Sequence, residues 1–345
     1  MAGTLHTRAR SRLGGGPDAC AALDLGTNNC RLLVAQPAAN GFRVLDGFSQ
    51  IVRLGEGLAA SGRLSEAAMD RALAALRSCA QKISAHPGAR IRSVATQACR
   101  VASNGPEFLA RARAETGLEF SVITPEEEAR LAVLGCAPLV DGDADLALVI
   151  DVGGGSTELS WVDAAALRAG EPCAIRAWTS LPFGVVTLAE EHLADVDGDE
   201  WYENMVERVA VVLRAYEGAE ALRPLFENGR AHYLGASGTV TSLAGVLLGL
   251  PRYQRNKVDG VWLSVDQACC AIERLRRLGR GYRSEHPCIG VDRADLVVPG
   301  GAILEAIFRV WPAQRIRVAD RGLREGMLYA LMKDCAAERL AHGRR

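Results

Sequence analysis

Three short segments of the chain combine glycine with residues that carry a hydroxyl or an amide group, and each follows an apolar run. Glycine lets a turn expose consecutive backbone N–H groups, because no Cβ blocks the approach of a ligand. Such a turn binds anions, and a helix that begins beside it adds its own N-terminal N–H groups. An ordinary tight hairpin is the alternative for any one turn, but three such turns favour a phosphate site. The predicted phosphate-binding residues are Gly26, Thr27, Asn28, Asn29, Arg31, Gly153, Gly154, Gly155, Ser156, Thr157, Gly235, Ser237, Gly238 and Thr239.

An acidic segment offers a second kind of chemistry. Thr124 fits the N-cap of a helix with Pro125 as its first residue, and Glu127 fits the return arm of a capping box. We expect Glu126 to pair with Arg130 four residues later. Glu128 then falls on the apolar side of the helix, where burial would raise the pKa of its carboxyl and make it a base near neutral pH. An acid-rich first turn that only complements the helix dipole is the alternative.

The turns and acids must be positioned by strands and helices that alternate along the chain. Apolar runs at 20–25, 31–35, 91–95, 120–123, 146–151, 159–162, 231–234 and 316–319 predict strands, and helical spacing occupies 63–85, 106–115, 201–216, 240–248 and 323–337. Ser65 is the expected N-cap of the first helix. An apolar segment at 294–298 leads into Pro299-Gly300-Gly301 and a further helix. This alternation predicts the α/β class.

The strand–turn–strand unit occurs twice. Asp24-x-Gly26 and Asp151-x-Gly153 each end an apolar strand, and a gap-free alignment places Arg31 against Glu158. A single repeat at this distance does not predict a solenoid. It predicts two domains that each open with the same hairpin. The 345 residues are also enough for about two domains.

Composition excludes several classes of protein. The 49% hydrophobic and 23% charged residues are typical of a globular chain, and no apolar run is long enough to span a membrane. The net charge of -1 argues against broad nucleic-acid binding. Ten cysteines without C-x-x-C or zinc-site spacing are expected to be reduced, buried thiols. We expect residues 1–18 to be a disordered tail, with a transit peptide as the alternative, and we expect a cytoplasmic location.

Six segments together resemble a known family. The duplicated hairpin is similar to that of the actin-like ATPase superfamily. Within it, the chain resembles the exopolyphosphatase and guanosine-pentaphosphate phosphohydrolase (Ppx/GppA) family over nearly all of 19–335, in its short, two-domain form. The motifs are A-L-D-L-G-T-N-N (22–29), A-T-Q-A-C-R (95–100), I-T-P-E-E-E-A-R-L (123–131), V-I-D-V-G-G-G-S-T-E-L (149–159), L-G-A-S-G-T (234–239) and G-L-R-E-G-M-L-Y (322–329).

The resemblance implies roles for five residues. Glu128 corresponds to the catalytic carboxylate that activates water, and Arg100 to a phosphate-binding arginine. Asp151 and Glu158 are expected to hold Mg²⁺ or another divalent cation, with Asp24 at the equivalent point of the first hairpin. The implied substrates are inorganic polyphosphate or pppGpp, with no nucleic-acid or membrane partner and with a homodimer left open.

The resemblance also implies an architecture. We expect two actin-like (ribonuclease H-like) domains with a cleft between them: 19–130, closed by a C-terminal helix at 323–340, and 131–322.

The chain departs from the family pattern at Asn29, at Thr124-Pro125 and at Asp259, which affects the choice of substrate. Arg252, Arg255 and Lys257 either follow a polyanionic substrate or belong to a solvated loop. An ATP-dependent small-molecule kinase of the superfamily and a non-catalytic nucleotide- or polyphosphate-binding module are the alternatives.

Overall fold

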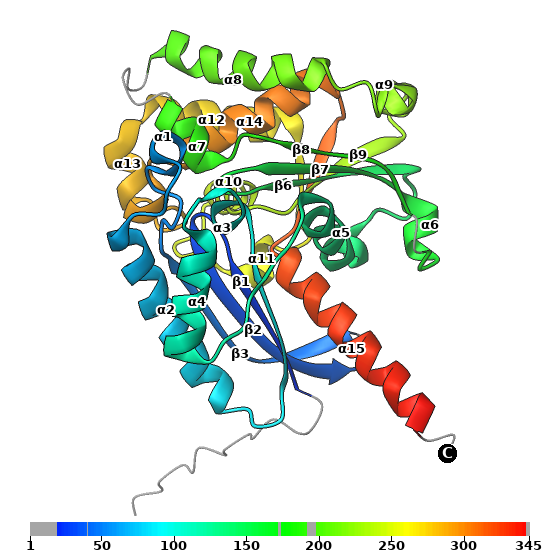
Figure 1. Ribbon diagram of the computed structural model, residues 1–345. Helices are drawn as coiled ribbons and strands as arrows, with labels where there is room; N and C mark the ends of the chain where they lie inside the picture. The colour runs from blue at the N-terminus through cyan, green and yellow to red at the C-terminus, as the bar shows by residue number, and fades with distance from the viewer. Residues whose placement is uncertain (1–18, 40, 172–173, 192–197, 343–345) are drawn as a thin grey trace, which may run out of the picture.

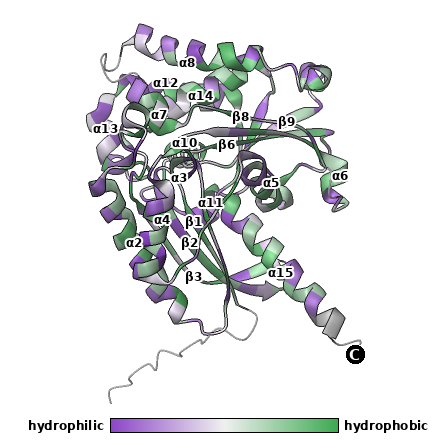
Figure 2. Cartoon of the chain, in the orientation of Figure 1, coloured by the Kyte–Doolittle hydropathy of each residue, from purple (hydrophilic) through white to green (hydrophobic). Residues whose placement is uncertain are grey.

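The computed structural model describes residues 19–39, 41–171, 174–191 and 198–342, and the expected tail at 1–18 lies outside them. Two β-sheets, each covered by helices on both faces, form the two halves of the molecule (Figure 1). Hydrophobic residues concentrate in the strands and on the inner faces of the helices (Figure 2). Among the helices of the described part of the chain, none is long and apolar enough to cross a membrane.

The first sheet has the strand order β3-β2-β1-β4-β5. Strands β1, β2 and β3 are antiparallel neighbours, whereas β4 and β5 extend the sheet in parallel from β1. The edge strand β3 was not predicted from the sequence, because its residues are mostly half-buried or exposed and lack a clear apolar alternation. The strands are β1 (Cys20–Leu25), β2 (Asn29–Ala38), β3 (Gly41–Ile51), β4 (Arg90–Ala95) and β5 (Ser121–Val122).

The second sheet repeats this topology and adds one strand. Its order is β10-β11-β9-β6-β7-β8, so the run β8-β7-β6-β9-β11 corresponds to the whole first sheet, with β10 antiparallel at the edge. The shared order, with three antiparallel strands followed by two parallel ones, confirms the two-domain actin-like α/β fold. The strands are β6 (Leu146–Val152), β7 (Thr157–Asp163), β8 (Ile175–Leu181), β9 (Ala231–Gly235), β10 (Trp262–Ser264) and β11 (Arg315–Val318).

The two opening hairpins match residue for residue. Asp24 lies opposite Arg31 in the β1–β2 pair, and Asp151 lies opposite Glu158 in the β6–β7 pair. The gap-free repeat read from the sequence is therefore a structural repeat, with a basic residue in one hairpin where the other has an acid.

Helices cover both faces of each sheet (Figure 1). α2 and α4 bury one face of the first sheet, and α15 packs against the other, on β1 and β2. In the second sheet, one face packs against α7, α8, α12 and α14, and the opposite face against α5. The helices are α1 (Leu58–Ser61), α2 (Glu66–Ser84), α3 (Gln97–Val101), α4 (Gly105–Thr116), α5 (Pro125–Cys136), η1 (Ala137–Leu139), α6 (Ala164–Arg168), α7 (Val185–Glu191), α8 (Asp199–Arg214), η2 (Glu220–Leu222), α9 (Arg223–Glu227), α10 (Gly238–Leu247), α11 (Arg255–Val258), α12 (Val265–Arg277), α13 (Gly279–Glu285), η3 (Val291–Arg293), α14 (Val297–Val310) and α15 (Leu323–His342).

Helices α5 and α15 cross at two glycines. A Cβ on Gly326 would lie 1.9 Å from the carbonyl oxygen of Leu131, and a Cβ on Gly135 would lie 2.0 Å from that of Gly322. Only glycine allows the backbones to approach this closely. The expected domain boundary at 130/131 falls inside α5, which contacts both α15 and the second sheet, so the division into domains stays a prediction.

Three local expectations need correction. The side chain of Glu127 pairs with Arg92 and does not close a capping box, although the Thr124 side chain does cap α5. Arg130 approaches Glu127, at 3.9 Å, rather than Glu126. Helix α14 begins before Pro299-Gly300-Gly301 and runs through it. The two residues are glycines because they pack directly against Thr239 and Ile272, where a side chain would not fit.

Candidate active site

A pocket of about 420 Å³ lies where the ends of the two sheets meet. The β1–β2 turn, the β6–β7 turn, the start of α10 and the start of α15 form its walls, and Glu128 of α5 reaches it from the side. Most of the predicted phosphate-binding residues line this pocket. They are Gly26, Thr27, Asn28, Asn29, Arg31, Gly153, Gly154, Gly155, Ser156, Ser237, Gly238 and Thr239.

The two hairpin turns are closed in the same way and abut each other. Gly26 N donates to Asn29 O and Gly153 N donates to Ser156 O, both at 2.9 Å. A Cβ on Gly154 would lie 3.0 Å from the Cβ of Thr27 and 3.1 Å from the backbone nitrogen of Asn28. The glycine triplet therefore serves the contact between the halves of the molecule as well as exposing backbone N–H groups.

Four predicted site residues lie behind the pocket wall. The Thr157 hydroxyl donates to the carbonyl oxygen of Phe183 at 2.7 Å and is fully buried, and Gly235 packs against Val240 inside β9. Glu158 is buried on β7 and Arg100 lies on α3, and neither belongs to the lining. Thr157 and Gly235 thus support the turns, while Glu158 and Arg100 act on the charged groups that do line the pocket.

Glu128 is placed by the start of α5. The Thr124 hydroxyl oxygen accepts from Glu127 N at 3.2 Å, which fixes the first turn of the helix. The Glu128 side chain is only 13% exposed. Burial raises the pKa of its carboxyl well above the usual value, the charge of Glu158 raises it further, and Arg100 opposes the rise. A carboxylate in this environment is a stronger base than one in water.

The guanidinium of Arg100 is engaged by the protein itself. Its Nε and Nη2 donate to Gln97 Oε1 at 3.1 and 2.6 Å, and its Nη1 donates to Ile123 O at 2.6 Å. Nη1 also lies 3.4 Å from Glu128 Oε2. In this arrangement Arg100 contacts the carboxylate of Glu128, and its expected role in phosphate binding stays a prediction.

The three expected metal ligands are acids near one another: Glu158 is buried, and Asp24 and Asp151 are half-buried in the pocket wall. Burial raises the pKa of Asp151 to about 7, with a further increase from the charge of Glu158. Burial also raises the pKa of Asp24, against the opposing charge of Arg31. Burial raises the pKa of Glu158 as well, against hydrogen bonds from Ser180 and Ser156. A bound cation would stabilise the ionised form of all three.

The donors fit a divalent cation that keeps much of its water. Next to Asp24, the side-chain oxygens of Asn28 and Asn29 are buried and have no hydrogen-bond partner. In the described ranges, no group of three or more His, Cys, Asp or Glu residues is placed so that these residues alone could hold a metal ion. Mg²⁺ commonly binds one or two carboxylates and completes its shell with water and phosphate oxygens. The residues present therefore suit Mg²⁺ better than a closed site for a softer metal.

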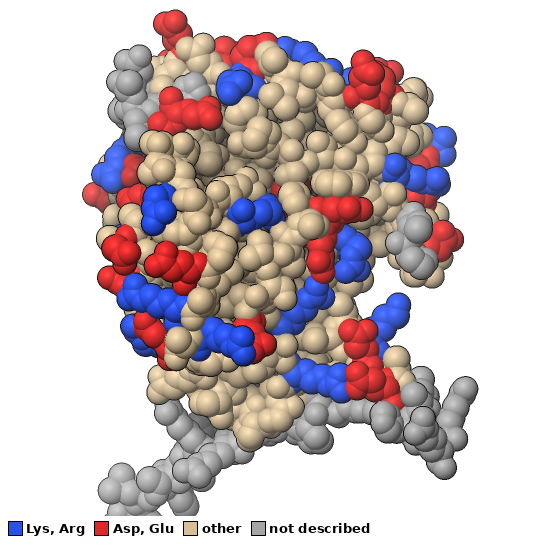
Figure 3. Space-filling view, viewed as in Figure 1, with Lys and Arg blue, Asp and Glu red and all other residues tan. Residues whose placement is uncertain are grey.

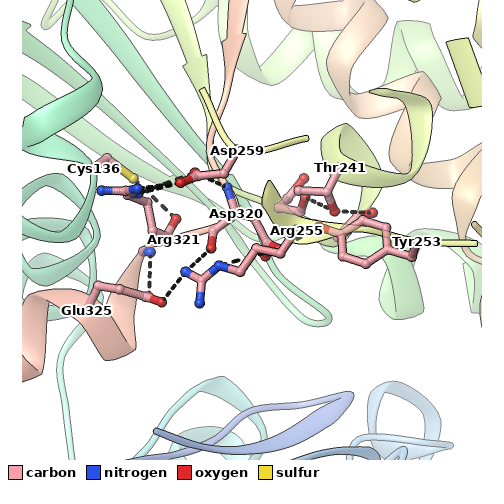
Figure 4. A network of polar contacts seen from close by, with 11 residues as sticks. Cys136, Thr241, Tyr253, Arg255, Asp259, Asp320, Arg321 and Glu325 are labelled. Atoms are coloured by element: carbon pink, nitrogen blue, oxygen red, sulfur yellow. Dashed lines mark hydrogen bonds and ion pairs between the residues drawn. The ribbon is translucent and has the colours of Figure 1, made fainter. Parts of the chain in front are cut away.

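A polar network at the start of α15 joins Arg255 and Asp259 to residues for which the sequence suggested no role. Arg255 of α11 donates to Glu325 Oε1 at 2.8 Å, and Glu325 Oε2 accepts from Gly322 N at 3.0 Å. Tyr253 donates to Asp320, and Arg321 pairs with Asp259 (Figure 4). The network fixes the turn between β11 and α15 in the pocket wall. In the sequence, the segment 322–329 pointed to this part of the pocket wall, because it matches a motif of the family.

Arg255 lines the pocket, whereas Arg252 and Lys257 do not. Three other arginines of the lining, Arg31, Arg293 and Arg324, form no ion pair with any described residue. Burial lowers the pKa of Arg324, as expected for a cation without a close counter-ion. On the outer face shown in Figure 3, acidic and basic side chains are interspersed. The lining also contains the acids Asp24, Glu128, Asp151, Asp320 and Glu325, so basic and acidic side chains both face the pocket.

Comparison with known proteins agrees with this geometry. The model of the Ppx/GppA phosphatase family matches residues 33–335. A Ppx/GppA family member from Aquifex aeolicus is 27% identical with a TM-score of 0.73, over 92% of this chain and 98% of that chain. An exopolyphosphatase-like protein is 29% identical with a TM-score of 0.77, over 90% and 96%. An exopolyphosphatase from Cytophaga hutchinsonii shares the fold, with a TM-score of 0.80 at 23% identity, over 92% and 98%. The chain therefore belongs to the Ppx/GppA phosphatase family and is a phosphoanhydride hydrolase.

Proposed function

We propose that this chain is an exopolyphosphatase that releases the terminal phosphate of inorganic polyphosphate by attack of water, with Mg²⁺ or another divalent cation. The position of Glu128 carries the proposal: a carboxylate with a raised pKa lies in the wall of the pocket of about 420 Å³ that two glycine turns also line. The exopolyphosphatase-like protein at 29% identity supports the substrate class. The 5′ end of pppGpp carries the same terminal phosphoanhydride and is the second candidate substrate.

The terminal phosphate would bind between the two halves of the molecule. Backbone N–H groups of the turns at 26–29 and 153–156 offer hydrogen bonds to its oxygens. The guanidinium groups of Arg31 and Arg324, which form no ion pair within 4 Å in the described structure, would neutralise part of its charge. The walls formed by the turns and by α15 would hold the phosphorus atom in line for attack.

Glu128 would act as the general base. Its carboxylate accepts a proton from a water molecule as the water oxygen attacks the terminal phosphorus, and the bond to the bridging oxygen breaks. Its raised pKa makes it a better proton acceptor at neutral pH than an ordinary glutamate. Asp24 and Asp151, with the orphaned amide oxygens of Asn28 and Asn29, would hold the cation from the pocket wall, and Glu158 would add its negative charge from behind that wall. The cation would supply neutralisation of the charge that develops on the phosphate oxygens.

Phosphate release tests the proposal directly. The measurement compares long-chain polyphosphate with pppGpp, with and without Mg²⁺, for the wild type, Glu128→Gln and Glu126→Gln. Glu126 is exposed on the same helical turn and serves as the matched control. We expect Glu128→Gln to lower kcat at least about a hundredfold, as removal of a general base does, with Glu126→Gln close to the wild type. Equal rates for Glu128→Gln and the wild type would remove Glu128 from the mechanism.

The same assay separates the alternatives. A kinase would release little phosphate until ATP and an acceptor were supplied. A binding module would retain polyphosphate without turning it over. Phosphate release from polyphosphate alone, dependent on Glu128, is expected only of the hydrolase.

A further inference from the structure

Gln97 lines the pocket but has no part in the mechanism above. It is the first residue of α3, directly after β4, and it belongs to the A-T-Q-A-C-R segment for which the sequence suggested a role only for the arginine. Its amide oxygen accepts from both Nε and Nη2 of Arg100, at 3.1 and 2.6 Å. One side-chain oxygen therefore restrains a whole edge of the guanidinium.

The other side of the guanidinium is restrained as well. Nη1 of Arg100 donates to Ile123 O at 2.6 Å, in the segment that leads into α5. Arg100 is thus held between a side chain of α3 and the backbone just before the helix that carries Glu128.

The restraint keeps Arg100 from a close ion pair with Glu128. The distance from Nη1 to Glu128 Oε2 is 3.4 Å, whereas a charge-assisted N–H···O bond is commonly about 2.7–2.9 Å. The side chains of Arg100 and Glu128 are only 17% and 13% exposed, so water screens their attraction weakly. Two opposite charges in such a place should close on each other unless something holds them apart.

We infer that Gln97 is a positioning residue: by holding Arg100 it keeps the Arg100–Glu128 ion pair at 3.4 Å, prevents a shorter or bidentate pair, and keeps a Glu128 oxygen free for the attacking water. The inference rests on the proposed role of Glu128 as the base. Through its long contact with Oε2, Arg100 orients the carboxylate and leaves Oε1 free of it.

Gln97 is itself held by the glycine turn of the other half of the molecule. A Cβ on Gly155 would lie 2.9 Å from Cγ of Gln97 and 2.9 Å from Oγ1 of Thr27. The Cβ and Cγ of Gln97 are therefore packed against the β6–β7 turn, which restricts where its amide can lie relative to Arg100.

A double-mutant cycle on polyphosphate hydrolysis tests the inference. Gln97→Met removes the acceptor with little change in size. We expect kcat to fall about tenfold with KM changed less than about twofold, because the substitution disturbs the base and not substrate binding. In the Arg100→Met background, Gln97→Met should lower kcat by less than about twofold, because Gln97 acts through Arg100. Gln97→Leu, which also lacks the acceptor, should behave in the same way.

Two outcomes overturn the inference. If Gln97→Met lowers kcat by the same factor in the wild-type and Arg100→Met backgrounds, Gln97 does not act through Arg100. A higher KM with unchanged kcat would make Gln97 a direct substrate contact. Gln81→Met, an exposed glutamine on α2, controls for the chemical change, and melting curves verify folding. If Glu128→Gln is inactive and the effects of Gln97→Met and Arg100→Met on kcat simply multiply, the inference fails and the proposed function stands. If Glu128→Gln is active, the proposed function itself is refuted.

Discussion

Replacing Asp151 with asparagine should stabilise the metal-free protein, and more so at alkaline than at acidic pH. The carboxyl is buried beside Glu158 and Asp24, and its pKa is raised from 3.8 to about 7, by burial first and then by the charge of Glu158. A raised pKa means that the folded protein holds the proton more tightly than the unfolded chain. Stability is therefore lost as the pH rises from about 4 to about 7, because the unfolded chain releases this proton in that range while the folded protein still holds it.

The size of the effect follows from the two pKa values. One pKa unit corresponds to about 1.4 kcal/mol, so the ionised carboxylate costs about 4 kcal/mol at pH 8. At pH 5 the folded protein still holds its proton while the unfolded chain has lost most of it, and the cost is about 2 kcal/mol. Asparagine has nearly the same shape and no charge. Asp151→Asn should remove a cost that is about 2 kcal/mol larger at pH 8 than at pH 5.

Urea denaturation in the presence of a chelator, at pH 5 and pH 8, measures this difference. Asp292→Asn is the control, because Asp292 is exposed, and it should change the unfolding free energy by less than about 0.5 kcal/mol at either pH. Mg²⁺ should stabilise the wild type more than Asp151→Asn, since binding to the folded state raises its stability. The reasoning is refuted if Asp151→Asn lowers the unfolding free energy, or if it raises the unfolding free energy by the same amount at pH 5 and pH 8.

Two further predictions concern close backbone contacts. Gly326→Ala places a Cβ 1.9 Å from the carbonyl oxygen of Leu131 and should lower the unfolding free energy by more than about 2 kcal/mol, whereas Gly281→Ala, with nothing within 4 Å, should change it little in the same urea titration. Gly154→Ala places a Cβ 3.0 Å from Thr27 and should lower kcat/KM for polyphosphate at least about tenfold by parting the two turns, and an unchanged steady-state rate would contradict this role.

The opening hairpins were the most predictable part of the fold. Their glycine turns, their strand-end acids and their gap-free repeat are all local patterns, and the paired strands reproduce them as Asp24 opposite Arg31 and Asp151 opposite Glu158. The N-cap of α5 at Thr124 was equally local, because its side chain bonds only three residues ahead.

The side-chain partners of the charged residues were much less predictable. Glu127 pairs with Arg92 rather than closing its own cap, because a residue from β4 lies within reach only after folding. Arg100 faces Gln97, Ile123 and Glu128, although its motif suggested a phosphate contact. Rotamers of long side chains are chosen by neighbours that are distant in the sequence.

By itself the sequence determined the family, the two repeated hairpins and the residue types that suit a phosphate and a cation, since each depends on a few consecutive residues. The tertiary structure decided which of them share one pocket, that Gly135 and Gly326 let α5 and α15 cross, and that burial raises the pKa of Glu128 and Asp151. Burial and Coulomb interactions depend on distances in space, and those distances exist only once the two sheets have packed together.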